Sequence, residues 1–149
     1  MKILLRSDGN EYTGYGHLLR LNAFAEILRK NFEIKFLTRD TSNIKLLSKW
    51  IDPEYIPSHF SNSEEINLIS TNYTGYIIIL DGYQFDELYQ KELKSKGFKL
   101  IYIDDMANSY MYADCVLNHA IGLNKINYHG ENYTKYFLGS EFALLRQGF

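Results

Sequence analysis

The sequence predicts an α/β fold in which a parallel sheet carries helices on both faces. Short apolar runs alternate with helical patterns along the 149 residues, which is the rhythm of repeated βαβ units. The two clearest strand candidates, Met1–Arg6 and Tyr76–Leu80, are continuously apolar at their centres, as strands buried on both faces are. A length of 149 residues with 46% apolar composition predicts one domain.

The first half of the chain alternates strand and helix. After the Met1–Arg6 strand and a glycine-containing loop, apolar residues recur at helical spacing from Leu18 to Leu28. A second strand is predicted over Glu33–Thr38. Two further helices are predicted over Ile44–Ile51 and Glu64–Ser70.

The second half continues the pattern with one strong strand and several shorter ones. The Tyr76–Leu80 strand leads to a polar helix over Phe85–Lys96. The remaining predicted strands are Lys99–Ile103, Cys115–Leu117 and Tyr136–Leu138.

The loop between the first strand and the first helix, SDGNEYTGYGHLLR at 7–20, is the strongest candidate for a functional site. Gly14 and Gly16 let a ligand approach the main chain and allow backbone angles that side chains forbid. His17 then falls in the first turn of the helix, beside free N–H donors that attract an anionic group such as a phosphate. An imidazole placed there can serve as a general base, although a histidine after a glycine turn can also merely cap the helix.

Two familiar glycine templates do not fit this loop. Leu19 stands where a dinucleotide-binding fingerprint requires glycine or alanine, and no Gly-Lys-Ser/Thr follows as a P-loop requires. The sequence therefore disfavours nicotinamide binding and ATP hydrolysis.

Carboxylates follow several of the predicted strands. Asp8 follows the first strand, Asp81 follows the Tyr76–Leu80 strand, and Asp104 and Asp105 follow the Lys99–Ile103 strand. Ligands of open parallel sheets bind at the carboxyl edge, so these side chains could face one cleft with His17 and Tyr83. The alternative is that the aspartates cap helices and bind loop N–H groups.

Composition excludes several other classes of function. The net charge is −2 and the lysines are scattered, so nothing indicates nucleic-acid binding. No segment approaches the roughly 20 apolar residues of a membrane span, and no signal peptide is recognisable, so we expect a cytosolic protein. Cys115 is the single cysteine, and we expect it to be inert packing in a strand. The four histidines show no metal-ligand spacing, so no metal is predicted, and only the adjacent Asp104 and Asp105 leave a metal site open.

Four sequence blocks carry a resemblance to a known family. They are RSDGNEYTGYGHLLR at 6–20, IILDGYQF at 78–85, IYIDDMANSYMYADCVLN at 101–118 and FLGSEFALLRQGF at 137–149. Together they resemble the N-terminal half of the UDP-sugar hydrolases of pseudaminic acid biosynthesis, which serve flagellin glycosylation, and of the related spore-coat polysaccharide protein family.

The resemblance implies a Rossmann-like domain that forms the N-terminal half of a two-domain fold of the GT-B glycosyltransferase type. In this family the N-terminal domain receives the sugar and the C-terminal domain grips most of the UDP. We therefore expect residues 1–149 to form the sugar-side domain, and we expect the UDP-binding domain to lie outside this chain and to be needed for turnover.

The resemblance also implies roles for individual residues. His17 occupies the position of the catalytic histidine, which orients or deprotonates the water that releases UDP from a 2,4-diacetamido-2,4,6-trideoxyhexose without a metal or other cofactor. The residues expected to contact substrate are Gly14, Tyr15, Gly16, Asp81, Tyr83, Asp104, Asp105 and Asn118. The residues expected to support the loop are Arg6, Asp8 and Arg20. The chain departs from the family at Asn118-His119-Ala120 and at Gln147-Gly148, so its sugar preference could differ.

Two other functions remain open at this stage. One is a GT-B glycosyltransferase similar to the enzyme that makes the peptidoglycan lipid disaccharide, whose glycine loop also ends in histidine. The other is a non-catalytic module that binds a sugar or a partner protein. A histidine required for product release distinguishes the enzymes from the binding module.

Overall fold

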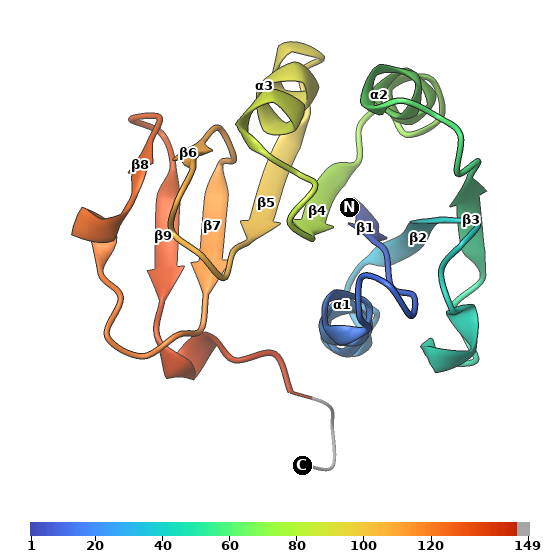
Figure 1. Ribbon diagram of the computed structural model, residues 1–149, viewed down its shortest axis with the longest axis horizontal. Helices are drawn as coiled ribbons and strands as arrows, with labels where there is room; N and C mark the ends of the chain where they lie inside the picture. Colours follow the sequence, from blue (N-terminus) through green and yellow to red (C-terminus); the bar gives the residue numbers. More distant parts are fainter. Residues whose placement is uncertain (146–149) are drawn as a thin grey trace.

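A single parallel sheet organises the chain in the computed structural model, which describes residues 1–145 (Figure 1). Its strand order is β3-β2-β1-β4-β5-β7-β9, and every neighbouring pair is parallel. The strands are β1 (Lys2–Ser7), β2 (Glu33–Arg39), β3 (Pro53–Ile56), β4 (Ile77–Asp81), β5 (Lys99–Ile103), β7 (Cys115–Asn118) and β9 (Lys135–Leu138). Gln147 and Gly148, named above as a departure from the family pattern, lie outside the described residues, as does the end of the fourth block.

Helices cover both faces of this sheet, as predicted. Figure 1 shows α1 (Gly16–Leu28) on one face and α2 (Asn62–Asn72) with α3 (Glu87–Ser95) on the other. Short 3₁₀ helices are η1 (Ile44–Leu46), η2 (Lys125–Asn127) and η3 (Ser140–Phe142). The predicted α/β fold class is therefore confirmed.

The apolar residues of the central strands alternate between two cores. On one face, Leu5 of β1 and Ile79 of β4 pack with Leu18 and Leu21 of α1. On the other face, Leu4 of β1 and Ile78 of β4 belong to a second core with residues of α2 and α3. The helix residues in this core include Ile66, Ile69 and Leu93. This double burial explains why the central strands are continuously apolar.

The strand register fixes which polar residues meet at the carboxyl edge. Ser7 at the end of β1 lies beside Asp81 at the end of β4, and Asp81 lies beside Ile103 at the end of β5. The loops that follow these three strands therefore leave the sheet at one edge. The N-terminus of α1 begins at that same edge, directly after the loop that follows β1.

The predicted helix over Ile44–Ile51 is wrong. Only Ile44–Leu46 form a 3₁₀ turn, which the Asn43 side chain caps, and Leu47 is extended with ψ 154°. The next residue is fixed by another element, because the Ser48 N–H donates to the Asn22 side chain of α1 at 2.8 Å. Leu46, Leu47 and Ile51 pack into the core that α1 shares with the sheet, while the chain returns to start β3.

Three short strands escaped prediction. β3 begins at Pro53 and pairs with β2 alone, which suits a proline because an edge strand leaves one row of N–H groups unpaired. The strands β6 (Tyr110–Met111) and β8 (His129–Gly130) form a two-residue parallel pair. Segments this short show no periodicity that a sequence pattern can detect.

We expect Ile79→Ala to destabilise the protein by about 2–5 kcal/mol, because the side chain is fully buried between β1 and α1 and its removal leaves a cavity. Urea unfolding followed by circular dichroism measures this loss. The matched variant Ile121→Ala removes the same atoms from a side chain that is 90% exposed, and it should change the stability little. Equal effects of the two variants would contradict the described core.

Candidate active site

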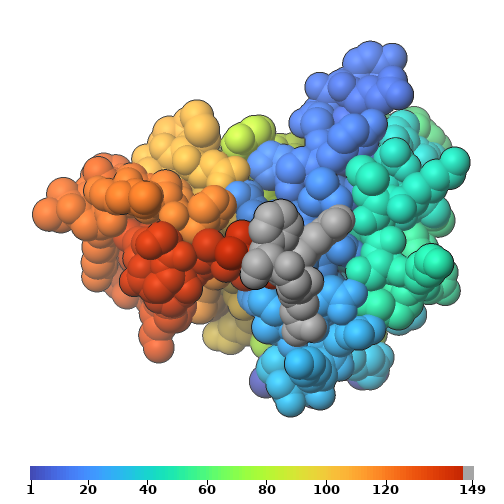
Figure 2. All heavy atoms as spheres, turned by 90° about the horizontal axis from the view of Figure 1, so that it is seen from below, coloured from blue at the N-terminus to red at the C-terminus, as the bar shows by residue number. Residues whose placement is uncertain are grey.

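The loop before α1 is a compact turn that projects from the domain. The Asn10 side-chain oxygen accepts hydrogen bonds from the N–H groups of Tyr12 at 2.9 Å and Thr13 at 3.0 Å. The Gly14 N–H donates to the Asn10 carbonyl at 2.9 Å and closes the turn. Tyr12 at its tip is 97% exposed, and Figure 2 shows a blue segment from the first 20 residues standing out from the surface.

The glycines of this loop have the expected roles only in part. Gly14 has φ +80°, which side chains rarely adopt, as predicted. Gly16 is the first residue of α1, so the expectation that it needs an unusual backbone angle is wrong; a Cβ there would meet open space. Gly9 was not singled out, yet a Cβ on it would lie 2.7 Å from the Leu18 Cβ. Gly9 therefore allows the loop to pack against α1.

His17 lies in the first turn of α1, where the sequence placed it. Tyr15 is the N-cap residue and provides no side-chain cap to the helix, so the first N–H groups of α1 remain open to a ligand. The His17 side chain is 16% exposed. The Tyr83 ring stands edge-on to the imidazole, with ring centroids 4.6 Å apart and planes at 89°.

Asp81 fixes the orientation of the imidazole. Its Oδ1 lies 2.8 Å from His17 Nδ1, and the carboxylate is fully buried. A carboxylate that faces an arginine accepts hydrogen bonds and does not donate them, so the contact with Asp81 favours the tautomer with hydrogen on His17 Nδ1. Arg20 Nη2 lies 3.3 Å from the same nitrogen, and the roles at this atom depend on the tautomer. In the neutral form of that tautomer the lone pair is on Nε2, which makes no hydrogen bond within residues 1–145 and is the ring nitrogen left for a water or a substrate.

Arg20 joins the carboxylates of two strands to α1. Its Nε donates to Asp81 Oδ2 at 2.8 Å, and its Nη1 donates to Asp105 Oδ1 at 2.6 Å. Arg20 lies one helical turn after His17, so both side chains leave the same face of α1 and reach the end of β4. The cluster of His17, Arg20, Asp81 and Asp105 thus comes from three elements that are far apart in the sequence.

The charge of Arg20 holds Asp105 in its ionised form. Burial by itself opposes ionisation of this carboxyl, but the hydrogen bonds and the charge of Arg20 outweigh it, and the pKa of Asp105 lies below its ordinary value. Asp8 behaves in the same way: burial opposes its ionisation, the Arg6 guanidinium outweighs this effect, and its pKa is lowered. Both groups are therefore anionic in the folded protein at neutral pH.

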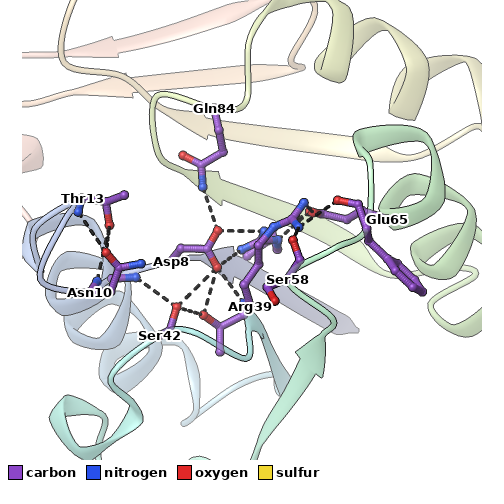
Figure 3. Close-up of polar contacts among 12 residues, drawn as sticks. Asp8, Asn10, Thr13, Arg39, Ser42, Ser58, Glu65 and Gln84 are labelled. Carbon is purple, nitrogen blue, oxygen red and sulfur yellow. Dashed lines mark hydrogen bonds and ion pairs between the residues drawn. The ribbon is translucent and has the colours of Figure 1, made fainter.

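Arg6, Asp8, Arg39 and Glu65 form a second charged cluster, here called the ion quartet. Arg6 is fully buried and donates to Glu65 Oε1 at 2.7 Å and to Asp8 Oδ1 at 2.6 Å. Arg39 Nη2 donates to Glu65 Oε2 at 2.7 Å, and the Arg39 N–H donates to Asp8 Oδ1 at 2.7 Å. Figure 3 shows Asp8 between the Asn10 and Thr13 side of the loop and the Arg39 and Glu65 side, with Gln84 above it. Arg6 and Asp8 lie next to the loop. Their expected role in supporting it stays a prediction.

A cavity of about 440 Å³, here called the histidine cavity, joins the two clusters. It is lined by Asp8, Asn10, Thr13, His17, Arg39, Thr41, Asn62, Tyr83 and Gln84. Three of these residues, His17, Asp8 and Tyr83, belong to the residues that the sequence singled out. The cavity therefore lies on the side of His17 that faces Arg39 of β2 and Asn62 of α2.

A second cavity of about 590 Å³, here called the Asp104 cavity, lies on the other side of Tyr83. It is lined by Tyr83, Asp86, Tyr102, Asp104, Met106, Asn108 and Ser109. Tyr83 is 63% exposed and lines both cavities, so its ring is a wall between them.

Asp104 and Asn118 form a buried group around Tyr128 and do not contact His17. Asp104 Oδ2 accepts from Tyr128 Oη at 2.8 Å and from the Ala107 N–H at 2.7 Å. The Asn118 amide donates to Tyr128 Oη at 2.9 Å and accepts from the Ala120 N–H. Asn118 is 1% exposed and lines neither cavity, so the expectation that it contacts substrate does not fit this structure. Both of its side-chain groups are already occupied.

Sequence reasoning missed most of the lining of the histidine cavity. Asn10, Thr41 and Asn62 are isolated polar residues in loops or at a helix start, and residues of this kind are common on any surface. Glu65 lies on the buried face of α2, where its side chain is 1% exposed. A carboxylate at a helix position that is otherwise apolar was the one sequence signal that could have indicated a buried ion pair. Its partner Arg39 ends β2 and was not singled out either.

Metal and membrane features are absent from the described part of the chain. Residues 1–145 contain no group of three or more histidine, cysteine, aspartate or glutamate side chains that could hold a metal ion. No helix among these residues has the length and apolar character to cross a membrane. Cys115 is half-buried and free, and burial raises the pKa of its thiol.

Comparisons with known proteins support the fold. No family model matches the chain. An uncharacterised protein of Methanocaldococcus jannaschii, MJ1062, is 30% identical over 155 aligned positions, covering 100% of this chain and 32% of that protein. The crystal structure of Acinetobacter baumannii MurG superposes with a TM-score of 0.60 at 11% identity, covering 91% of this chain and 45% of MurG. The chain thus spans about a third of the curated relative and less than half of MurG, and it has a Rossmann-like fold of the GT-B kind.

We expect Glu65→Gln to cost about 3–5 kcal/mol of stability, because the fully buried Arg6 loses one of its two counter-charges. The measurement is the free energy of unfolding in urea. Glu33→Gln is the matched control, since Glu33 pairs with Lys2 at 3.8 Å on the surface, where both side chains are more than half exposed. Glu33→Gln should lower the free energy of unfolding much less. A loss as large as that of Glu65→Gln would contradict the buried ion pairs described for the ion quartet.

The lowered pKa values of Asp105 and Asp8 predict a loss of stability in acid. A folded pKa below the unfolded value means that the unfolded chain binds more protons, so the free energy of unfolding falls as the pH is lowered from about 5 to about 3. Asp105→Asn should flatten this dependence, whereas Asp40→Asn, at an exposed position, should leave it unchanged. An Asp105→Asn profile parallel to that of the unmodified protein would refute the assignment.

Proposed function

We propose that this chain is the sugar-side domain of a metal-independent UDP-sugar hydrolase. The observation that carries the proposal is the His17–Asp81 pair at the edge of a cavity, with the imidazole oriented from behind by a buried carboxylate. This is the arrangement expected of a general base. The substrate implied by the resemblance is a UDP-linked 2,4-diacetamido-2,4,6-trideoxyhexose, in the biosynthesis of pseudaminic acid-type sugars for surface polysaccharide or flagellin.

In the proposed reaction, His17 Nε2 accepts a proton from a water while the water oxygen bonds to the anomeric carbon. The bond between that carbon and the diphosphate oxygen breaks, and UDP leaves with the electron pair. Asp81 stabilises the imidazolium that forms, because its carboxylate already accepts the Nδ1 hydrogen at 2.8 Å. A diphosphate is a good leaving group, so the protein mainly has to orient one water and move its proton.

The position of the diphosphate follows from the uncapped N-terminus of α1. The open N–H groups at Gly16 and His17 favour an anion there. Gly14 and Gly16 leave open space where other residues would carry a Cβ, which suits close approach of a phosphate. We propose that a second domain holds the uridine and most of the diphosphate, as the resemblance implies, and that substrate is bound between the two domains.

A glycosyltransferase is the second candidate, and the fold likeness to MurG favours it. In a transferase, an acceptor hydroxyl would replace the water, and the same histidine would remove its proton. The two reactions differ in what UDP release requires: a hydrolase needs only water, whereas a transferase also needs its acceptor. A binding module would release no UDP under either condition.

The test is UDP release from UDP-2,4-diacetamido-2,4,6-trideoxy-β-L-altropyranose by the native gene product, read through its full reading frame. We expect His17→Ala to lower kcat by about 10²–10⁴-fold, because the general base is lost. His129→Ala is the matched control, since that histidine is exposed and lines neither cavity. UDP release that survives in His17→Ala would contradict the role of His17.

Running the reaction in ¹⁸O-labelled water shows which bond breaks. Attack at the anomeric carbon places the label in the sugar and leaves UDP unlabelled, whereas attack at phosphorus labels UDP. No release without an added acceptor, followed by release with one, would establish the transferase.

A further inference from the structure

We propose that the histidine cavity selects an uncharged sugar ring, and that Asn62, with Thr41 and Asn10, determines this specificity. The inference rests on the proposed function, because it names the part of the substrate that lies beside His17. It adds residues that neither the sequence motifs nor the resemblance singled out.

The cavity contains charged side chains of the ion quartet, and these are paired with one another. Within the ion quartet, the two guanidinium charges of Arg6 and Arg39 are balanced by the two carboxylates of Asp8 and Glu65. Arg39 is the arginine that lines the cavity, and its Nη1 is further occupied by the carbonyl oxygens of Phe60 at 2.9 Å and Ser58 at 3.1 Å. Asp8 accepts from Arg6, from the Arg39 N–H and from Gln84 at 3.1 Å (Figure 3). A charged ligand group would therefore meet no unpaired side chain of the ion quartet.

Neutral hydrogen-bonding groups of the lining are free. In the part of the chain that the structure describes, no hydrogen bond uses the Asn62 side-chain amide, the Thr41 hydroxyl or Nδ2 of Asn10, although all three residues line the cavity. Asn10 is held in place because its Oδ1 accepts the N–H groups of Tyr12 and Thr13. These groups supply both donors and acceptors without charge, and they match the hydroxyl and amide substituents of a sugar.

The remaining wall also suits a sugar. The Tyr83 ring and the His17 imidazole close one side of the cavity at right angles to each other. A volume of about 440 Å³ is enough for one pyranose ring and falls in the usual range for small-ligand sites. A carboxylated sugar of the same size would bring its charge to a cavity whose arginine is already paired with Glu65, so we expect it to bind more weakly than a neutral sugar.

The experiment compares two probes that differ at one carbon, methyl β-D-glucopyranoside and methyl β-D-glucopyranosiduronate. Each is titrated into the native gene product, and the backbone amide signals are followed by NMR. We expect the neutral glycoside to shift the signals of Asn10, Thr41 and Asn62, and we expect the glucuronide to bind at least about tenfold more weakly. Equal affinity for both probes, no shift with the neutral probe, or shifts centred on Met106 and Asn108 of the Asp104 cavity would each overturn the proposal.

A charge-adding variant makes the test specific to the cavity. We expect Asn62→Lys to strengthen glucuronide binding at least about tenfold, because it supplies the missing cation. Asn67→Lys adds the same charge to the same helix at an exposed position outside the cavity lining, and it should leave both affinities unchanged. An identical gain in the two variants would show that only net charge matters and would overturn the assignment to Asn62.

These measurements do not depend on turnover. Neutral-sugar selectivity without UDP release would retain this inference and refute the proposed function. UDP release that needs His17, together with sugar binding outside the histidine cavity, would retain the proposed function and refute this inference.

Discussion

The candidate site depends on one fully buried carboxylate, Asp81, at the end of the central strand β4. A buried charge is tolerated only when hydrogen bonds satisfy it. Here the donors come from α1, where His17 supplies Nδ1 and Arg20 supplies Nε and Nη2. Because one carboxylate holds both side chains, it fixes the helix against the sheet and the imidazole against the cavity. Stability and the proposed chemistry thus share a single interaction.

A second buried cluster has the complementary effect on the loop side of His17. The ion quartet ties β1 and β2 to α2 through Glu65, and Tyr89 of α3 donates to the same carboxylate at 2.7 Å. Its charges cancel internally, so it contributes rigidity to the wall of the histidine cavity and no net attraction for ions. The anion-attracting feature of the site is then the uncapped start of α1, a few residues away. This separation gives the diphosphate and the sugar different environments.

The sequence predicted the parts of this arrangement that follow from strong local patterns. The continuous apolar runs identified β1 and β4, and the glycine loop identified the start of α1 and placed His17 in its first turn. The carboxyl-edge rule brought Asp81 and Asp105 toward His17, because parallel strands end at one edge. None of these inferences required the identity of the ligand.

The rest depended on contacts that a sequence pattern does not contain. The predicted helix over 44–51 is wrong because Leu47 is extended and packs into the core that α1 shares with the sheet. Asn118 had the right position after a strand but turned inward to Tyr128, a residue ten positions later in the chain. Asn62 became part of the cavity only because α2 begins beside the end of β2. Such pairings are decided by tertiary packing.

The most direct test of the central claim is the tautomer of His17, read from a long-range ¹H–¹⁵N correlation spectrum of its imidazole at neutral pH. We expect hydrogen on Nδ1, where Asp81 accepts it, and an unprotonated Nε2 that can serve as a base. A spectrum that shows hydrogen on Nε2 with a bare Nδ1 would contradict this role, because His17 would then have no N–H to donate to Asp81 and its lone pair would be on Nδ1, which faces Asp81.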